Sequence, residues 1–244
     1  MNTYFFLPMT IYLPELEQEH DASFPDIESA LHDPDGLLAM GGDLTPKRLL
    51  LAYSHGIFPW YSNDDPILWW SPSIRGVFIP ENYTPSKSLK KFFKKSGYSI
   101  TINHATSDVI SLCASTRPAE ETWIMPEMIE AYQNLAKLGH CHSVEVWFNN
   151  ELVGGLYGLQ IGQVFCGESM FSIKTNASKI ALWKFCEHFV AFGGKLIDCQ
   201  MMNPHLESLG AIPMERPIFN ERLQVFSAIS VFENCYQPQS LSNG

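Results

Sequence analysis

The chain has 244 residues, of which 45% are hydrophobic and 17% charged, and its formal net charge at pH 7 is −10. This length and apolar content allow one large domain or two modest ones, and they exclude a chain that is disordered throughout. The six cysteines contain no Cys-x-x-Cys pair, which argues against a zinc cage or a small disulfide scaffold and fits the reducing cytoplasm.

The first part of the chain predicts a small N-terminal domain. The apolar run FFLPMTIYL contains a proline and follows no lysine or arginine, so we interpret it as neither a signal peptide nor a membrane span. No apolar run approaches the roughly 20 residues that a spanning helix needs. Thr45 and Pro46 predict the cap and first residue of a helix that Gly56 ends. Turn-forming residues then place a domain boundary near residue 72, between residues 1–72 and 73–244.

A lysine-rich helix is predicted next. Residues 86–98 hold five of the 16 basic residues and none of the 26 acidic ones. Helical spacing puts Leu89, Phe92 and Phe93 on one side and the lysines on the other, namely Lys87, Lys90, Lys91, Lys94 and Lys95. An isolated lysine run is usually a solvated helix face. Here like charges four residues apart repel one another with no acid to offset them, which favours a polyanionic partner.

Residues 143–200 predict the core of a larger α+β domain with a mixed sheet. Alternating apolar residues indicate three strands joined by turns at Asn149-Asn150 and Gly162-Gln163. A crossover helix follows, with Asn176 as its side-chain cap and Gly193-Gly194 at its end, and then a fourth strand. This order of elements is typical of acyl-transfer domains.

Three polar residues interrupt these apolar strands. Asp198 and Gln200 are two residues apart, so both are expected on one face of the fourth strand, with Ile197 on the other. Glu168 adds a second carboxylate beside Gly167, where the backbone can be approached closely. The alternative is that the aspartate and glutamine are buried and satisfy each other and the nearby backbone.

Searches for other motifs favour neither a metal nor a cofactor. The chain has no GxGxxG, GxxxxGK[ST], GxSxG or HExxH pattern. His140-Cys141-His142 lacks a second pair of ligands, so we predict a loop there rather than a metal cluster.

Several longer strings carry a family resemblance. FPDIESALHDPDGLLAMGGDLTPKRLLLAYSHGIFPWY, PILWWSPSIRGVF, LVGGLYG, FCGESMFS, NASK and KLIDCQ resemble the bacterial leucyl/phenylalanyl-tRNA–protein transferases, from about Phe24 to about Pro213. The resemblance implies a small N-terminal domain followed by a domain related to the acetyltransferase (GNAT) fold. It also implies an aminoacyltransferase that works without cofactor or metal, which we expect to be a cytoplasmic monomer.

The activity that the resemblance implies is transfer of leucine or phenylalanine, and possibly methionine as a third donor, from aminoacyl-tRNA to proteins. The acceptors implied are proteins that begin with arginine or lysine, and the new peptide bond marks them for degradation by the N-degron pathway. The lysine face would then hold the acceptor stem through its phosphates.

The resemblance also implies roles for single residues. Trp60 and Trp123 match positions that contact the 3′-terminal adenosine, where stacking of a base on an aromatic ring is worth roughly 1 to 3 kcal/mol. Trp69 and Trp70 are predicted to be core residues. The side-chain pocket of the donor would be formed by Leu156, Phe165, Met170, Phe185 and Ile197. Since Ile197 points away from Asp198 on a flat strand, this pocket requires a twist or bulge at the strand end.

The catalytic roles follow from the same three polar residues. We assign Asp198 to polarise Gln200, and Gln200 to orient the acceptor amine and help take its proton. Glu168 would position an amino group of the donor or acceptor through a charge-assisted hydrogen bond.

Two other classes of protein are consistent with parts of the pattern. A coenzyme A dependent acetyltransferase shares the order of strands and helix, but it usually has a glycine-rich loop where this chain has SIKTNASK. A non-enzymatic RNA-binding or adaptor protein would use the lysines and tryptophans alone, with no need for the three polar residues.

Overall fold

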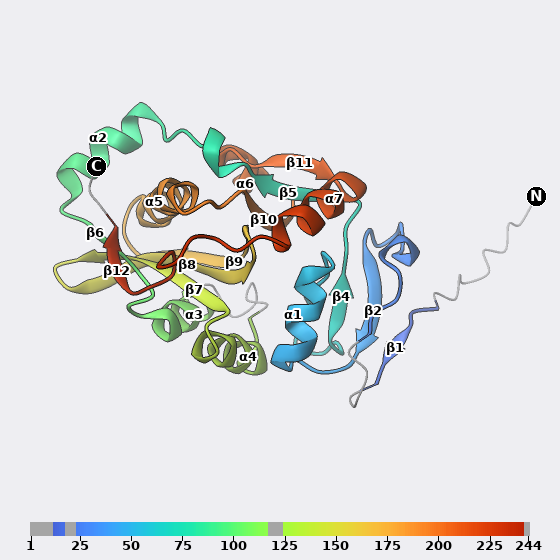
Figure 1. Ribbon diagram of the computed structural model, residues 1–244. Coiled ribbons are helices and arrows are strands. Elements are labelled where there is room, and N and C mark those ends of the chain that lie inside the picture. Colours follow the sequence, from blue (N-terminus) through green and yellow to red (C-terminus); the bar gives the residue numbers. More distant parts are fainter. Residues whose placement is uncertain (1–11, 18–22, 117–123, 242–244) are drawn as a thin grey trace, which may run out of the picture.

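A computed structural model of the chain describes residues 12–17, 23–116 and 124–241. These residues form a four-stranded and an eight-stranded sheet (Figure 1). Because the larger sheet combines antiparallel strand pairs with one parallel pair joined through a crossover helix, the predicted α+β class is confirmed.

The smaller sheet has the strand order β1-β2-β4-β3 and is built from the N-terminal residues. Its elements are β1 (Glu15–Leu16), η1 (Ile27–Ser29), β2 (Leu37–Gly41), α1 (Pro46–Ser54), β3 (Phe58–Pro59) and β4 (Leu68–Trp70). The predicted helix is confirmed as α1: the Thr45 side chain accepts a hydrogen bond from the Arg48 amide, and Pro46 is the first helical residue. Leu49 and Tyr53 of α1 are buried in the core.

The larger sheet has the strand order β11-β5-β10-β9-β8-β7-β6-β12. Its strands are β5 (Ile74–Phe78), β6 (Ser99–Ile102), β7 (Cys141–Phe148), β8 (Glu151–Ile161), β9 (Val164–Ser172), β10 (Leu196–Met201), β11 (Ile212–Glu215) and β12 (Gln239–Leu241). The accompanying helices are η2 (Pro80–Asn82), α2 (Lys87–Ser96), α3 (Thr106–Ser115), α4 (Pro126–Lys137), α5 (Ala177–Ala191), α6 (Pro204–Leu209) and α7 (Arg216–Ser227).

The central strands match the predicted hairpins. Asn149 and Asn150 have positive φ angles of 52° and 63°, which suit the tight turn between β7 and β8. The crossover helix α5 also ends at the predicted glycines. Its predicted side-chain cap is wrong: Asn176 occupies the cap position with φ 62° and its side chain makes no capping hydrogen bond.

Helices cover both faces of the larger sheet. Figure 1 shows α5 on one face and α3 and α4 on the other. The core on the α5 side includes Phe93 of α2, Phe165 of β9 and Phe185 of α5. The core on the α3 and α4 side continues into the N-terminal sheet and α1, so the two sheets share a hydrophobic core.

The two sheets divide the chain between Trp70 and Ile74. This division is consistent with a boundary near residue 72, which stays a prediction because α7 returns from the C-terminal part to contact α1. In the part of the chain described here, every helix is too short or too polar to cross a membrane.

Candidate active site

The parallel strands β9 and β10 separate beyond their first three residues. Leu196–Asp198 pair with Val164–Cys166, and the pairing of β10 with β5 is then shifted by a bulge between Asp198 and Met201. Gln200 lies within this bulge at φ 64°, which is an uncommon conformation for a residue other than glycine. The local conformation and the separation of the strands open a cavity between them.

This cavity is mostly apolar and has a volume of about 470 Å³. All five residues expected for the donor side-chain pocket line it, namely Leu156, Phe165, Met170, Phe185 and Ile197. The bulge that this pocket required is present, so Ile197, Cys199 and Gln200 all reach the cavity. A volume in this range suits a small ligand or an amino-acid side chain.

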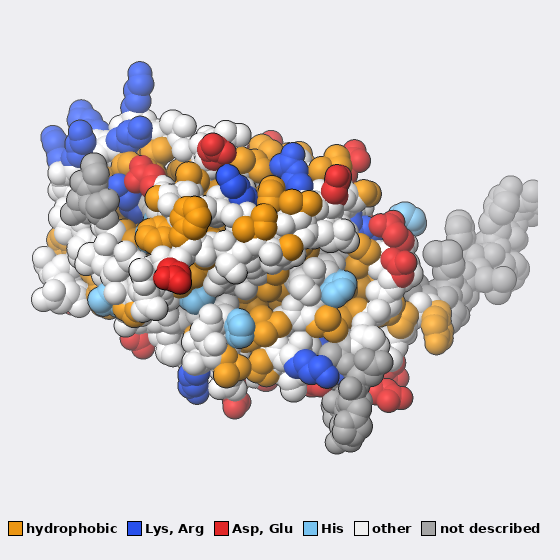
Figure 2. All heavy atoms as spheres, in the orientation of Figure 1, with side chains coloured by type: hydrophobic (Ala, Val, Ile, Leu, Met, Phe, Trp, Pro, Cys, Tyr) orange, Lys and Arg blue, Asp and Glu red, His pale blue; other side chains and the backbone are white. Residues whose placement is uncertain are grey.

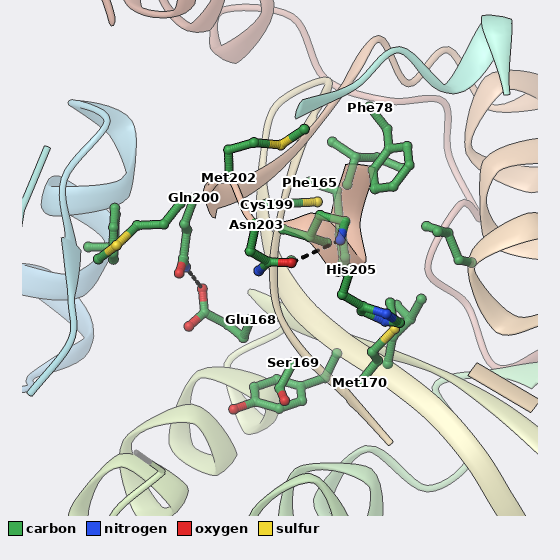
Figure 3. Close-up of a pocket in the computed structure, with 18 of the residues that line it drawn as sticks. Phe78, Phe165, Glu168, Ser169, Met170, Cys199, Gln200, Met202, Asn203 and His205 are labelled. Carbon is green, nitrogen blue, oxygen red and sulfur yellow. Dashed lines mark hydrogen bonds between the residues drawn. The ribbon is translucent and has the colours of Figure 1, made fainter. Parts of the chain in front are cut away.

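Glu168 lines the cavity and accepts hydrogen bonds from two residues. The Tyr53 hydroxyl donates a hydrogen bond to Glu168 Oε1 at 2.7 Å, and the Gln200 amide Nε2 donates to the same oxygen at 2.8 Å. Figure 3 shows the Gln200 amide and the Glu168 carboxylate pointing toward each other. The other carboxylate oxygen, Oε2, is buried and has no hydrogen-bond partner within the described residues.

The environment of Glu168 suits proton transfer near neutral pH. Burial raises the pKa of Glu168 to about 7, although hydrogen bonding to Tyr53 limits this rise. A carboxyl group with this pKa is partly ionised at neutral pH and can both accept and release a proton.

Two tyrosines that the sequence interpretation missed support Glu168. Tyr53 comes from α1 and Tyr132 from α4, and their hydroxyl oxygens are 2.6 Å apart. Both rings are buried, with exposed fractions of 1% and 0%. Helical periodicity predicts Tyr53 to point inward, but no local pattern indicates that both hydroxyls meet behind a carboxylate on β9.

Asp198 is arranged differently from the expectation. Its carboxylate accepts two hydrogen bonds from Arg75 of β5, each 2.8 Å long, and Asp198 Oδ1 also accepts one from the Gln200 backbone N–H at 2.9 Å. The prediction that Asp198 and Gln200 point in one direction is wrong, because the bulge turns Gln200 toward Glu168. Asp198 is fully buried, and among the hydrogen bonds of the described residues the Gln200 side chain bonds to Glu168 and not to Asp198.

The lysine helix has the two faces that its sequence predicts. The lysines of α2 are all exposed, while Leu89 and Phe93 are buried and the Ser86 side chain caps the helix. Figure 2 shows these lysines gathered at one end of the molecule, over α2 in the upper left of the view. Phe93 contacts Trp183 of α5 with 5.4 Å between ring centroids, and the next residue toward the start of α5, Leu182, lines the cavity. The buried face of α2 therefore contacts α5, the helix that also contributes to the cavity wall.

Known proteins resemble this chain over most of its length. Residues 77–224 match the model of the leucyl/phenylalanyl-tRNA protein transferase family, and residues 42–73 match the N-terminal domain of that family. A leucyl/phenylalanyl-tRNA–protein transferase of Aliivibrio fischeri is 72% identical over 235 residues, which cover 96% of this chain and 98% of that protein. The chain belongs to this family.

A second transferase of the family, from Photobacterium profundum, is 61% identical over 233 residues, covering 96% of this chain and 98% of that protein. Among solved structures, L-PGS from Bacillus licheniformis aligns with a TM-score of 0.38 and 10% identity over 68% of this chain and 53% of that chain. Family membership confirms the resemblance that the sequence strings indicated.

The tryptophans of this transferase occupy different environments. Trp69 and Trp70 are buried, as predicted, and their indole N–H groups donate hydrogen bonds to the carbonyls of Gly41 and Trp60. Trp60 is 40% exposed and lines the cavity. Trp123 lies outside the described residues, so its predicted contact with the terminal adenosine stays a prediction.

Further cavity residues come from the segment after β10. Figure 3 shows Met202, Asn203 and His205 among the labelled cavity residues. The Asn203 side chain caps α6 by accepting a hydrogen bond from the Leu206 amide at 2.9 Å. An Asn-Pro pair predicts such a helix start, but its position beside the cavity depends on the bulge in β10.

Among the described side chains, no group of three or more His, Cys, Asp or Glu is placed to hold a metal ion. His140-Cys141-His142 was predicted to be a loop, and the structure instead begins β7 at Cys141. All six cysteines are free thiols.

The raised pKa of Glu168 predicts how stability depends on pH. The folded protein binds the Glu168 proton more tightly than the unfolded chain does. The stability that this proton contributes is therefore present below about pH 4.5 and is lost as the pH rises through about 7. We expect Glu168→Gln to remove this loss and to be more stable than the wild type at pH 8, by up to about 3 kcal/mol. Urea unfolding of both proteins at pH 5 and pH 8 tests this prediction. If the free energy of unfolding changed between the two pH values by the same amount in the variant as in the wild type, the prediction would be contradicted.

Proposed function

We propose that this transferase takes leucine or phenylalanine, and methionine as a third donor, from aminoacyl-tRNA and joins it to proteins beginning with arginine or lysine. Its family membership makes the chain an aminoacyltransferase that moves leucine or phenylalanine from tRNA to protein N-termini. The single observation that supports the assignment of the site is that Glu168, with its hydrogen bond from Gln200, lines a mostly apolar cavity.

The reaction is attack of the acceptor α-amine on the ester that joins the amino acid to tRNA. A C–N bond forms, the C–O bond to the ribose breaks, and one proton leaves the amine while the ribose oxygen becomes a hydroxyl. The ester is already activated, so the protein has to orient the two reactants and move this proton.

We assign the proton transfer to Glu168 rather than to Gln200. A carboxylate with a pKa of about 7 is a competent base at neutral pH, and its Oε2 atom has no other described partner. The Gln200 amide is a poor base, but its N–H holds Glu168 Oε1 and leaves the amide oxygen to accept a hydrogen bond from the attacking amine.

The same geometry supports a proposed path for the tRNA. The exposed lysines of α2 are proposed to hold phosphates of the acceptor stem, and the exposed ring of Trp60 to stack on the terminal adenosine. The donor side chain then enters the apolar part of the cavity. We place this reaction in the cytoplasm, with the protein acting as a monomer.

The activity is tested by incubating the protein with labelled Leu-, Phe- or Met-tRNA and a peptide that begins with arginine. We expect the label to appear at the peptide N-terminus. The same peptide with an acetylated N-terminus, or with aspartate first, is the matched control and should stay unlabelled. Label in the aspartate peptide would contradict the proposed acceptor class.

A substitution within the cavity tests donor selection. Leu156 is buried in the cavity wall, so Leu156→Phe would fill space that the larger donor side chain needs. We expect kcat/KM for Phe-tRNA to fall at least about ten-fold more than kcat/KM for Leu-tRNA. Equal losses for both donors would place the donor side chain elsewhere.

A further inference from the structure

Arg75 occupies an unusual position beneath the cavity. Its side chain is 2% exposed, with the guanidinium lying between the rings of Phe58 and Phe219 at 4.7 and 4.6 Å from their centroids. Arg75 Nη1 donates a hydrogen bond to the Gly56 carbonyl at 2.7 Å. The other side of the guanidinium meets Asp198 through the two parallel bonds already described. Arg75 therefore contacts β3, α7, β10 and the segment after α1.

Asp198, the partner of Arg75, is hydrogen-bonded to the backbone of Gln200 at the cavity. Asp198 Oδ1, which accepts from Arg75 Nε, also accepts the backbone N–H of Gln200 at 2.9 Å. This hydrogen bond forms where Gln200 adopts φ 64°, a conformation that a non-glycine residue keeps only when its surroundings enforce it. From this backbone the Gln200 side chain reaches Glu168.

We propose that Arg75 is a positioning residue for aminoacyl transfer, which acts through Asp198 to hold Gln200 in its left-handed conformation and its amide against Glu168. This inference rests on the proposed roles of Gln200 and Glu168. The same inference makes Asp198 a second positioning residue, because its carboxylate accepts hydrogen bonds from Arg75 and from the Gln200 backbone N–H. Arg75 also packs on Phe58, which lines the cavity.

The geometry requires arginine at this position. The planar guanidinium makes two parallel bonds to one carboxylate, a third to a carbonyl, and stacks between two rings at once. The ammonium group of lysine is a compact point charge that cannot reproduce this set of contacts. Arg75→Lys therefore keeps the positive charge and loses part of the positioning.

The test is a double-mutant cycle between Arg75→Met and Gln200→Gly, with kcat and KM measured for Phe-tRNA and an arginine peptide. We expect Arg75→Met to lower kcat at least ten-fold and to change KM for Phe-tRNA less than two-fold. The Gln200→Gly variant has no amide side chain for Arg75 to position. In this background Arg75→Met should therefore lower kcat by less than a further two-fold. A residue that only supported the fold would lower kcat by the same factor in both backgrounds.

Arg48→Met is the matched control. Arg48 has the same 2% exposure as Arg75 and pairs with Asp43, but it does not line the cavity. We expect this variant to keep kcat within two-fold of the wild type. If Arg75→Met does not fold, Arg75→Lys takes its place in the cycle, with a smaller loss expected that again disappears in the Gln200→Gly background.

Two outcomes would overturn the proposal: an unchanged kcat in the Arg75 variants, or equal losses with and without the Gln200 side chain. Wild-type activity of Gln200→Gly alone would refute the proposed role of Gln200. If Arg75→Met nevertheless lowered kcat ten-fold while Gln200→Gly kept wild-type activity, Arg75 would act by another route. The failure of the positioning role and the failure of the catalytic assignment are thus separate results.

Discussion

Replacing Glu168 with glutamine is expected to lower kcat for aminoacyl transfer by at least about 100-fold. The substitution keeps the size of the side chain and an oxygen that can accept from Tyr53 and Gln200, so the cavity should keep its shape. What it removes is the only described carboxylate on the cavity lining, and with it the group proposed to take the proton from the acceptor amine. Single-turnover transfer from labelled Phe-tRNA measures the chemical step directly.

The pH dependence of the wild type supplies the control for this prediction. Since the ionised form of Glu168 is the proposed base, kcat should rise with pH through about 7. The acceptor α-amine, with a pKa near 7.7 to 8, adds a second rise at higher pH. In Glu168→Gln we expect the first rise to disappear and the second to remain. A profile that still rises through pH 7 in the variant would assign that titration to another group.

The outer strands of the larger sheet, β5, β6, β11 and β12, were not predicted from the sequence. Its central part, strands β7 to β10 with helix α5, could be predicted because the residues that indicate it are close together in the chain. Asn-Asn and Gly-Gln pairs mark its turns, alternating apolar residues mark its strands, and Gly193-Gly194 mark the end of α5. The two faces of α2 follow from residue spacing in the same way. Each of these features depends on residues only a few positions apart.

The site could be predicted only in part, because its geometry depends on distant residues and on a departure from regular strand structure. The two-residue spacing places Asp198 and Gln200 on one face of an ideal strand, and the bulge at φ 64° changes this. Arg75 is 123 residues from its partner Asp198, and Tyr53 is 115 residues from Glu168. The sequence around Arg75 or around Tyr53 does not indicate these contacts.

The charge distribution shows why net charge is a poor guide to the partner of this protein. Its formal charge of −10 would repel nucleic acid if it were spread evenly. The five lysines on the exposed face of α2 form a separate positive surface at one end of the molecule (Figure 2). At physiological ionic strength, charges more than about 8 Å apart are largely screened, so a bound phosphate responds mainly to the lysines beside it.

Replacing all five lysines of α2 with alanine is accordingly expected to weaken tRNA binding by about 100- to 1000-fold at low salt. Five phosphate contacts also predict that the logarithm of the wild-type affinity falls with the logarithm of salt concentration with a slope of about −4. The variant should lose most of this slope. Titration of labelled tRNA at several salt concentrations measures both quantities. Alanine at exposed lysines outside α2, Lys47, Lys137 and Lys195, is the matched control and should leave the slope unchanged.

Stability separates this binding role from a solvated helix face. Lys87, Lys90 and Lys91 each have another lysine four residues later, and every such pair destabilises the helix by a few tenths of a kcal/mol. The five-alanine variant should therefore be more stable than the wild type by about 1 kcal/mol at low salt while it binds tRNA less tightly. If the lysines served only to solvate the helix, their loss would leave tRNA affinity unchanged. Higher stability together with weaker tRNA binding is the result expected if these lysines bind a polyanionic partner.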